Sequence, residues 1–154
     1  MRKDVVLVTN NPCFQQLIDS SRLMFINGTS LDALSVARDA IHLGSELLTH
    51  PLYGNLRPDQ QPFRSTLIRN FDQQKERNLG AVAYLESISA IEEAVLLYSS
   101  YGSRMLTPEY LHGTVRDEYA FLDFELMRES LTSHGLLQVR NVSNFAMNLA
   151  EGGE

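Results

Sequence analysis

Three short polar clusters carry the residue types best suited to binding a ligand in this chain. The clusters are Thr9-Asn10-Asn11, Asn27-Gly28-Thr29-Ser30, and His50 with the loop that follows it. Each comes directly after an apolar run typical of a buried strand, at 5–8, 23–26 and 46–49. Because ligands of open α/β sheets bind beyond the carboxyl ends of parallel strands, we expect the clusters to share one edge. The first two also open helices, whose free N–H groups suit an anion.

The loop 50–62 holds the two side chains most able to do chemistry. Histidine is the usual general acid or base of enzymes, and His50 could take that role. The guanidinium of Arg57 could hold a carboxylate or a phosphate with two hydrogen bonds. A loop-anchoring hydrogen bond is the alternative for His50. For all three clusters the alternative is a structural one, because caps and turns also select Asn, Gly, Thr and Ser.

Cys13 is the single cysteine, and it lies near a predicted helix start, where a thiolate is stabilised. It has no CxxC partner, so a buried, inert thiol is the alternative interpretation. The other histidines, at 42, 112 and 134, lie near predicted helix ends, and no paired spacing typical of a metal site occurs. We expect no metal and no cofactor.

The elements that must position these residues predict an α/β fold. The three apolar runs alternate with helical patterns at 13–21 and 31–43, which is typical of parallel strands joined by crossovers. A fourth strand, at 63–68, has no crossover helix before it, so we expect it to be antiparallel and at an edge. The prediction is a small three-layer-like domain with a mostly parallel sheet of about four strands and C-terminal helices.

The second half of the chain reads as helical. One helix spans about 81–98, with an alternative start near Ser89, and another spans about 114–133. Residues 136–142 could form a further strand or an extended arm. The 114–133 helix has apolar residues on more than one side, which a single chain or a two-fold axis could cover. We expect a homodimer.

Length and composition set limits on the class of protein. The 154 residues predict one domain at 1–150 with a flexible tail at 151–154. The net charge of −6 argues against nucleic acid as a partner. No apolar run reaches the length of a signal peptide core or a membrane span, so we expect no membrane association and a cytoplasmic location.

Several stretches of the chain resemble the GrdX family. The similarity covers about residues 5–96 and is most specific at Leu48-Thr49-His50-Pro51-Leu52. The other matching stretches are Val8-Thr9-Asn10-Asn11-Pro12, Phe25-Ile26-Asn27-Gly28-Thr29-Ser30-Leu31-Asp32, Val36-Ala37-Arg38-Asp39, His42-Leu43-Gly44, Pro62-Phe63-Arg64-Ser65 and Ile91-Glu92-Glu93-Ala94. The resemblance implies a setting beside the glycine, sarcosine and betaine reductases of amino-acid-fermenting anaerobes. It implies an accessory role and assigns no catalytic residue.

Three hypotheses follow. In the first, the protein is a non-catalytic accessory protein that binds a reductase subunit or a small anionic metabolite at the strand-end edge. In the second, it is an enzyme acting on a phosphorylated or carboxylated compound, with His50 as acid or base and Arg57 as anion clamp. In the third, Cys13 relays a thiol redox reaction.

Overall fold

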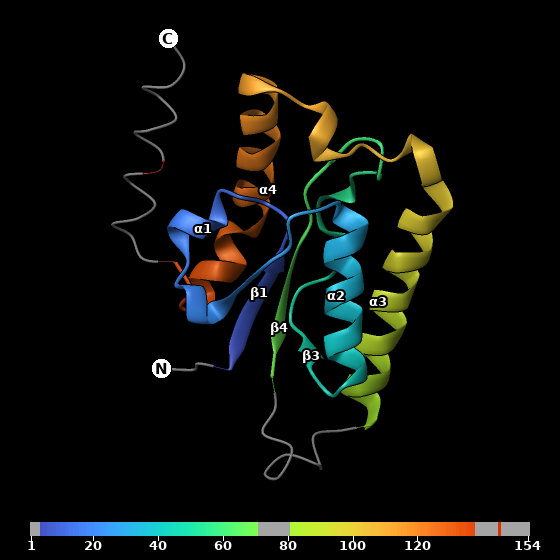
Figure 1. Cartoon of the computed structure of the whole chain (residues 1–154). Helices are drawn as coiled ribbons and strands as arrows, with labels where there is room; N and C mark the ends of the chain where they lie inside the picture. Colours follow the sequence, from blue (N-terminus) through green and yellow to red (C-terminus); the bar gives the residue numbers. More distant parts are fainter. Residues whose placement is uncertain (1–3, 71–80, 138–144, 146–154) are drawn as a thin grey trace.

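The computed structural model describes residues 4–70, 81–137 and 145. In this part of the chain a four-stranded sheet is covered by helices on both faces (Figure 1). The strands are β1 (Val5–Thr9), β2 (Leu23–Phe25), β3 (Glu46–Leu47) and β4 (Ser65–Arg69). The helices are α1 (Phe14–Leu17), α2 (Ser30–His42), α3 (Ala81–Tyr101) and α4 (Gly113–Ser133). The predicted α/β class with C-terminal helices is confirmed.

The sheet is mixed, with the order β2-β1-β4-β3. Only β1 and β2 pair in parallel, while β4 is antiparallel to both of its neighbours. The prediction of a mostly parallel sheet is therefore wrong, and so is the edge position of the fourth strand. The loop before β4 returns the chain to the middle of the sheet, between β1 and β3. The residue pattern within a strand does not predict which strands it will pair with.

Several predicted elements are shorter in the structure. The predicted helix 13–21 is a single turn, α1, followed by a 3-10 turn at Ser20–Arg22. β3 keeps two of its four predicted residues. α3 begins by residue 81 rather than near Ser89. Residues 136 and 137 form no strand, and the remainder of the predicted 136–142 element lies outside the described residues, as does the tail at 151–154.

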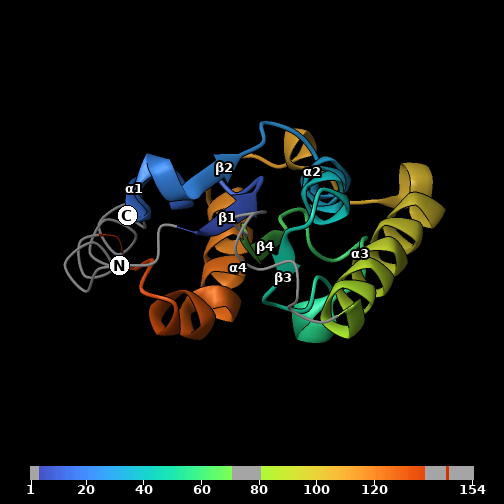
Figure 2. The ribbon, with the colours of Figure 1, turned by 90° about the horizontal axis from the view of Figure 1, so that it is seen from below.

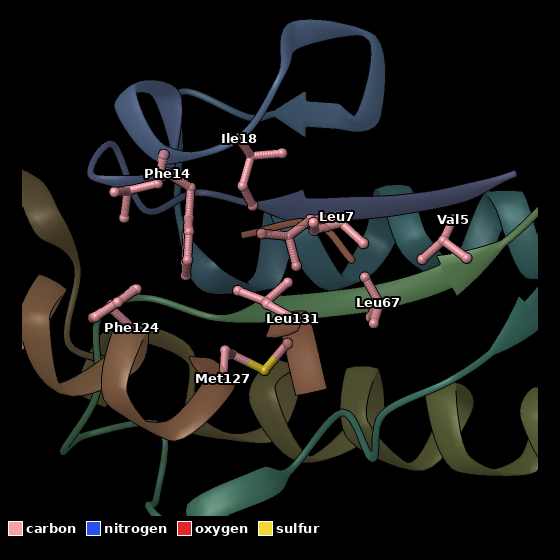
Figure 3. Close-up of a cluster of buried hydrophobic side chains, with 10 residues drawn as sticks. Val5, Leu7, Phe14, Ile18, Leu67, Phe124, Met127 and Leu131 are labelled. Carbon is pink, nitrogen blue, oxygen red and sulfur yellow. The ribbon is translucent and has the colours of Figure 1, made fainter. Parts of the chain in front are cut away.

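Alternation along β1 divides the interior into two apolar cores. Val5 and Leu7 face α1 and α4, whereas Val6 and Val8 face α2 and α3. Figure 3 shows the first core, in which Leu67 of β4 lies near Leu7 of β1 and near Leu131 and Met127 of α4. All four of these β1 side chains are buried, as expected for a strand covered on both faces. The end-on view in Figure 2 shows the sheet between its helices.

Polar groups close the ends of α2 and α4. Thr29 and Asp32 form a capping box at the start of α2. The buried guanidinium of Arg22 donates to the carbonyl oxygens of His134 and Gly135, just beyond the end of α4. A cation there also complements the helix dipole. None of the described helices combines the length and apolar character needed to cross a membrane.

α4 buries a different face from the apolar stripe at 115, 119, 122 and 126. Its buried side chains are Ala120, Asp123, Phe124, Met127 and Leu131. Val115, Leu122 and Leu126 are exposed in the single chain. The buried face of α4 therefore includes one carboxylate, that of Asp123.

The central position of β4 makes a direct prediction about stability. Leu67→Ala removes a fully buried side chain from the core between β4 and α4, so we expect a loss of about 2–5 kcal/mol in the free energy of unfolding. Leu96→Ala is the control, because that side chain on α3 is 72% exposed. Urea unfolding followed by circular dichroism measures both; equal losses would contradict a central β4.

Candidate functional site

The ends of β1, β2 and β3 and the start of β4 lie at one edge of the sheet. β1 and β2 are parallel, and β3 and β1 are both antiparallel to β4, so β1, β2 and β3 run in one direction. The three polar clusters therefore leave the sheet at the same edge. We call it the strand-end edge.

Asn10 joins the first two clusters to the residues before β4. Its Nδ2 donates to the carbonyl oxygens of Gly28 at 3.1 Å and Pro62 at 2.9 Å. Its Oδ1 accepts the backbone N–H of Arg64 at 2.8 Å. The side chain is buried, so these bonds satisfy an amide that would be costly to leave unpaired. Asn10 holds three chain segments together.

The second cluster mainly caps α2. Thr29 Oγ1 accepts the N–H of Asp32 at 3.1 Å, and the Asp32 carboxylate accepts the N–H of Thr29 at 2.8 Å. A Cβ at Gly28 would collide with that carboxylate. Ser30 is buried and donates to Met105 Sδ at 3.8 Å. Because Asp32 already places a negative charge at this helix start, a bound anion is disfavoured there.

In the third cluster, the side chains of His50 and Arg57 form their hydrogen bonds within their own loop. His50 is exposed, and its Nδ1 accepts the N–H of Leu52 at 3.1 Å. Arg57 is also exposed and pairs with Asp59 at 3.2 Å. In the described residues, no hydrogen bond links either side chain to Asn10 or Thr29. The structure therefore joins the first two clusters directly and places His50 and Arg57 on the outer surface of the loop.

A buried carboxylate that the sequence analysis did not select lies beneath the edge. Asp123, on α4, accepts hydrogen bonds from Ser65 Oγ at 2.7 Å, from Asn11 Nδ2 at 3.0 Å and from the Tyr53 hydroxyl. Thr9 Oγ1 lies 2.7 Å from Ser65 Oγ and extends the chain of hydroxyls. The Asp123 carboxylate of α4 is thus hydrogen-bonded to the segment after β1, to the loop 50–62 and to the first residue of β4.

Arg64 lies on the other side of β4 and is equally buried. Its Nη1 and Nη2 donate to the carbonyl oxygens of Tyr53 at 2.7 Å and Leu56 at 2.9 Å. Its Nε donates to the hydroxyl of Tyr98 on α3. The guanidinium carbon also lies 4.8 Å from the centre of the Tyr53 ring, which is a cation–π distance.

Burial controls the protonation of these groups. It raises the pKa of Asp123 above its ordinary value, although hydrogen bonds from Tyr53, Ser65 and Asn11 act in the opposite direction. Burial, followed by the charge of Asp123, raises the pKa of Tyr53, so the phenol keeps its proton and donates it. The same two causes raise the pKa of the Cys13 thiol. A thiol that stays protonated is a poor nucleophile, which weighs against a thiol redox relay.

The sequence carried signals for the residues that were missed. Asp123 interrupts an apolar stretch of a helix, between Leu122 and Phe124, where a charge is rare unless it is paired. Arg64 is enclosed in the same way by Phe63 and the strand after it. Asp123 lies 58 residues or more from Ser65, Tyr53 and Asn11, so spacing alone could not connect it to these partners.

The raised pKa of Asp123 gives a pH dependence with a defined sign. In the unfolded chain the carboxyl has an ordinary pKa of about 3.9, so the native state binds the proton at a higher pH. The contribution of this group to stability is therefore complete below the unfolded pKa and is lost as the pH rises through the native pKa.

Asp123→Asn removes this titration. We expect the unfolding free energy of the wild type minus that of the variant to decrease as the pH rises through this window and then to level off. Asp117→Asn, at an exposed position on the same helix, controls for the change in net charge. A difference that increases with pH would show a lowered native pKa.

Comparison with known proteins places the chain in a family. A family model described as GrdX-like protein matches residues 6–132, which include β2, β3 and β4, all of β1 except Val5, and all of α4 except Ser133. Searches of curated proteins and of solved structures found no match. The match includes the strand-end edge together with Tyr53, Arg64 and Asp123. The chain belongs to the GrdX-like protein family.

Proposed function

We propose that the protein is a cytoplasmic, non-catalytic accessory protein that binds a subunit of the glycine, sarcosine or betaine reductase system through the strand-end edge. The family supports the link to glycine reductase systems in general. The observation that carries the proposal of binding without catalysis is the closed hydrogen bonding of this edge. The buried side chains of Asn10, Asn11 and Ser65 are already bonded to nearby carbonyl and carboxylate groups, whereas Gln61 Nε2 has no hydrogen-bond partner among the described residues.

The exposed part of the edge supports a protein partner. His50 and Arg57 lie on the surface of the loop, and Asn27 lies on the surface just before α2. Beneath them, Asn10 fixes the backbone of both segments. A surface that is already ordered loses little conformational entropy on association, which favours specific docking.

The same geometry disfavours the enzyme hypothesis. The Nδ1 atom of His50 accepts a backbone N–H, so in the neutral ring the proton is on Nε2. In that state the ring offers a donor to the solvent and has no free base nitrogen. Arg57 is paired with Asp59, which competes with an incoming anion.

A charge reversal tests the proposal. We expect Arg57→Glu to weaken binding of the partner subunit about tenfold or more, because a like charge or an unpaired group then faces the partner. Arg128→Glu is a matched control, since Arg128 is similarly exposed and pairs with Glu125 at 3.3 Å, as Arg57 does with Asp59 at 3.2 Å. Purified subunits of the three reductases, passed over the immobilised protein, provide the measurement.

Binding of a subunit that Arg57→Glu weakens and Arg128→Glu does not would support the strand-end edge as the docking surface. Failure of every subunit to bind, or equal weakening by both variants, would overturn the proposal. Turnover of a phosphorylated or carboxylated compound that is lost in His50→Ala would favour the enzyme hypothesis instead.

A further inference from the structure

Arg64 is a buried cation whose direct partners are all uncharged. The side chain is 0% exposed, and its guanidinium donates to two backbone carbonyls and one tyrosine hydroxyl. Within the described residues, no carboxylate lies within 4.0 Å of it. Buried charges are ordinarily paired with an opposite charge, so neutral partners leave the charge uncompensated at close range.

Two carbonyl groups fill the terminal nitrogens of the Arg64 guanidinium. They bond to Nη1 and Nη2, the two terminal nitrogens of the guanidinium. A guanidinium presents these N–H groups as a planar fork that matches the paired oxygens of a carboxylate. Both carbonyls come from the four-residue segment Tyr53–Leu56, which we call the strap. The strap thus acts as an internal substitute for a ligand.

The backbone of the strap is held in an uncommon conformation. Gly54 has φ 79° and Asn55 has φ 51°, so two successive residues are left-handed. A left-handed residue other than glycine stores strain that the surrounding structure must hold. Gly54 also lies directly against Leu126 of α4, since a Cβ there would be 2.9 Å from Leu126 Cδ1. Leu126 is itself 37% exposed, so only a partly buried contact supports the strap from that side.

Local turns flank the strap on both sides. Tyr53 N donates to His50 O at 3.2 Å, and Gln60 N donates to Arg57 O at 2.9 Å. Each of these bonds joins residues three apart in the sequence, so it need not break when the strap moves. The strap itself reaches the sheet and α4 through the Tyr53 hydroxyl and the two carbonyls on Arg64. These bonds, together with the packing of the Tyr53 ring against the first core and the Arg64 guanidinium, separate the closed strap from an open one.

We propose that Arg64 is a latent carboxylate-binding residue. When the strap is displaced, a small carboxylate takes the place of the Tyr53 and Leu56 carbonyls on the guanidinium fork, while the hydroxyl of Tyr98 remains on Nε. Because the ligand binds only the open strap, it increases the population of that state. The inference does not depend on a reductase subunit, since it concerns a site within this chain.

Glycine substitution separates strap opening from general loss of stability. Gly54→Ala strains the closed strap, because alanine is unfavourable at that φ and its Cβ meets Leu126. Gly135→Ala is the control: Gly135 has a closely similar φ of +74°, nothing lies within 4 Å of its Cβ, and it follows α4 at the opposite end of the sheet. The Nε–H signal of Arg64 in a ¹⁵N-labelled sample reports on the guanidinium directly.

The probe is sodium acetate, added at constant ionic strength against sodium chloride. We expect acetate to shift the Arg64 signal to saturation, and Gly54→Ala to lower the acetate midpoint roughly five- to thirtyfold by populating the open strap. Gly135→Ala should leave the midpoint unchanged. Sodium phosphate is run in parallel to distinguish a carboxylate from a tetrahedral oxyanion.

A second pair of variants keeps the test decisive if Gly54→Ala does not fold. Leu126→Ala removes the side chain that supports the strap, and Leu122→Ala removes an equally exposed leucine from the same helix. We expect only Leu126→Ala to lower the midpoint. The proposal is overturned if acetate acts no differently from chloride, if phosphate alone shifts the signal, or if the strap variants and their controls have equal midpoints.

Discussion

The edge of this fold depends on the burial of two charged side chains on opposite faces of one central strand. Arg64 immediately precedes Ser65, the first residue of β4, and the two side chains reach helices on opposite sides of the sheet. One reaches Tyr98 on α3, and the other reaches Asp123 on α4. Buried polar groups must find partners, because leaving them unpaired in a poorly polarisable interior is costly. That requirement ties both helical layers to the same strand end.

Tyr53 connects the two sides of this arrangement. Its hydroxyl donates to Asp123 and accepts the N–H of Ser65, while its backbone carbonyl accepts from Arg64. Together with the carbonyl groups of Leu56 and Pro62, Tyr53 therefore anchors the loop 50–62, although the loop contains little regular structure. An anchored loop gives the strand-end edge a defined surface, which is what docking of a protein partner requires. The same anchoring also makes the loop responsive to any ligand that competes for Arg64.

Local pattern predicted the elements better than it predicted their arrangement. The strand at 5–8 and the helix that the second cluster opens depend on neighbouring residues, and both were found. The place of β4 depends on where a long loop returns the chain, so it was predicted wrongly. Asn10 was selected for its position after a strand, and its bonds to Gly28 and Pro62 agree with a shared edge. Asp123 and Tyr53 are 70 residues apart, and no spacing rule connects them.

The central claim is that Tyr53 holds the loop onto the start of β4, and amide hydrogen exchange tests it most directly. The backbone N–H of Ser65 donates to the Tyr53 hydroxyl at 3.0 Å, whereas that of Arg64 donates to Asn10 Oδ1 at 2.8 Å. We expect Tyr53→Phe to accelerate exchange at Ser65 strongly and to leave the Arg64 amide nearly unchanged, because only the first has lost its acceptor. Equal exchange rates at Ser65 in the wild type and the variant would contradict the account.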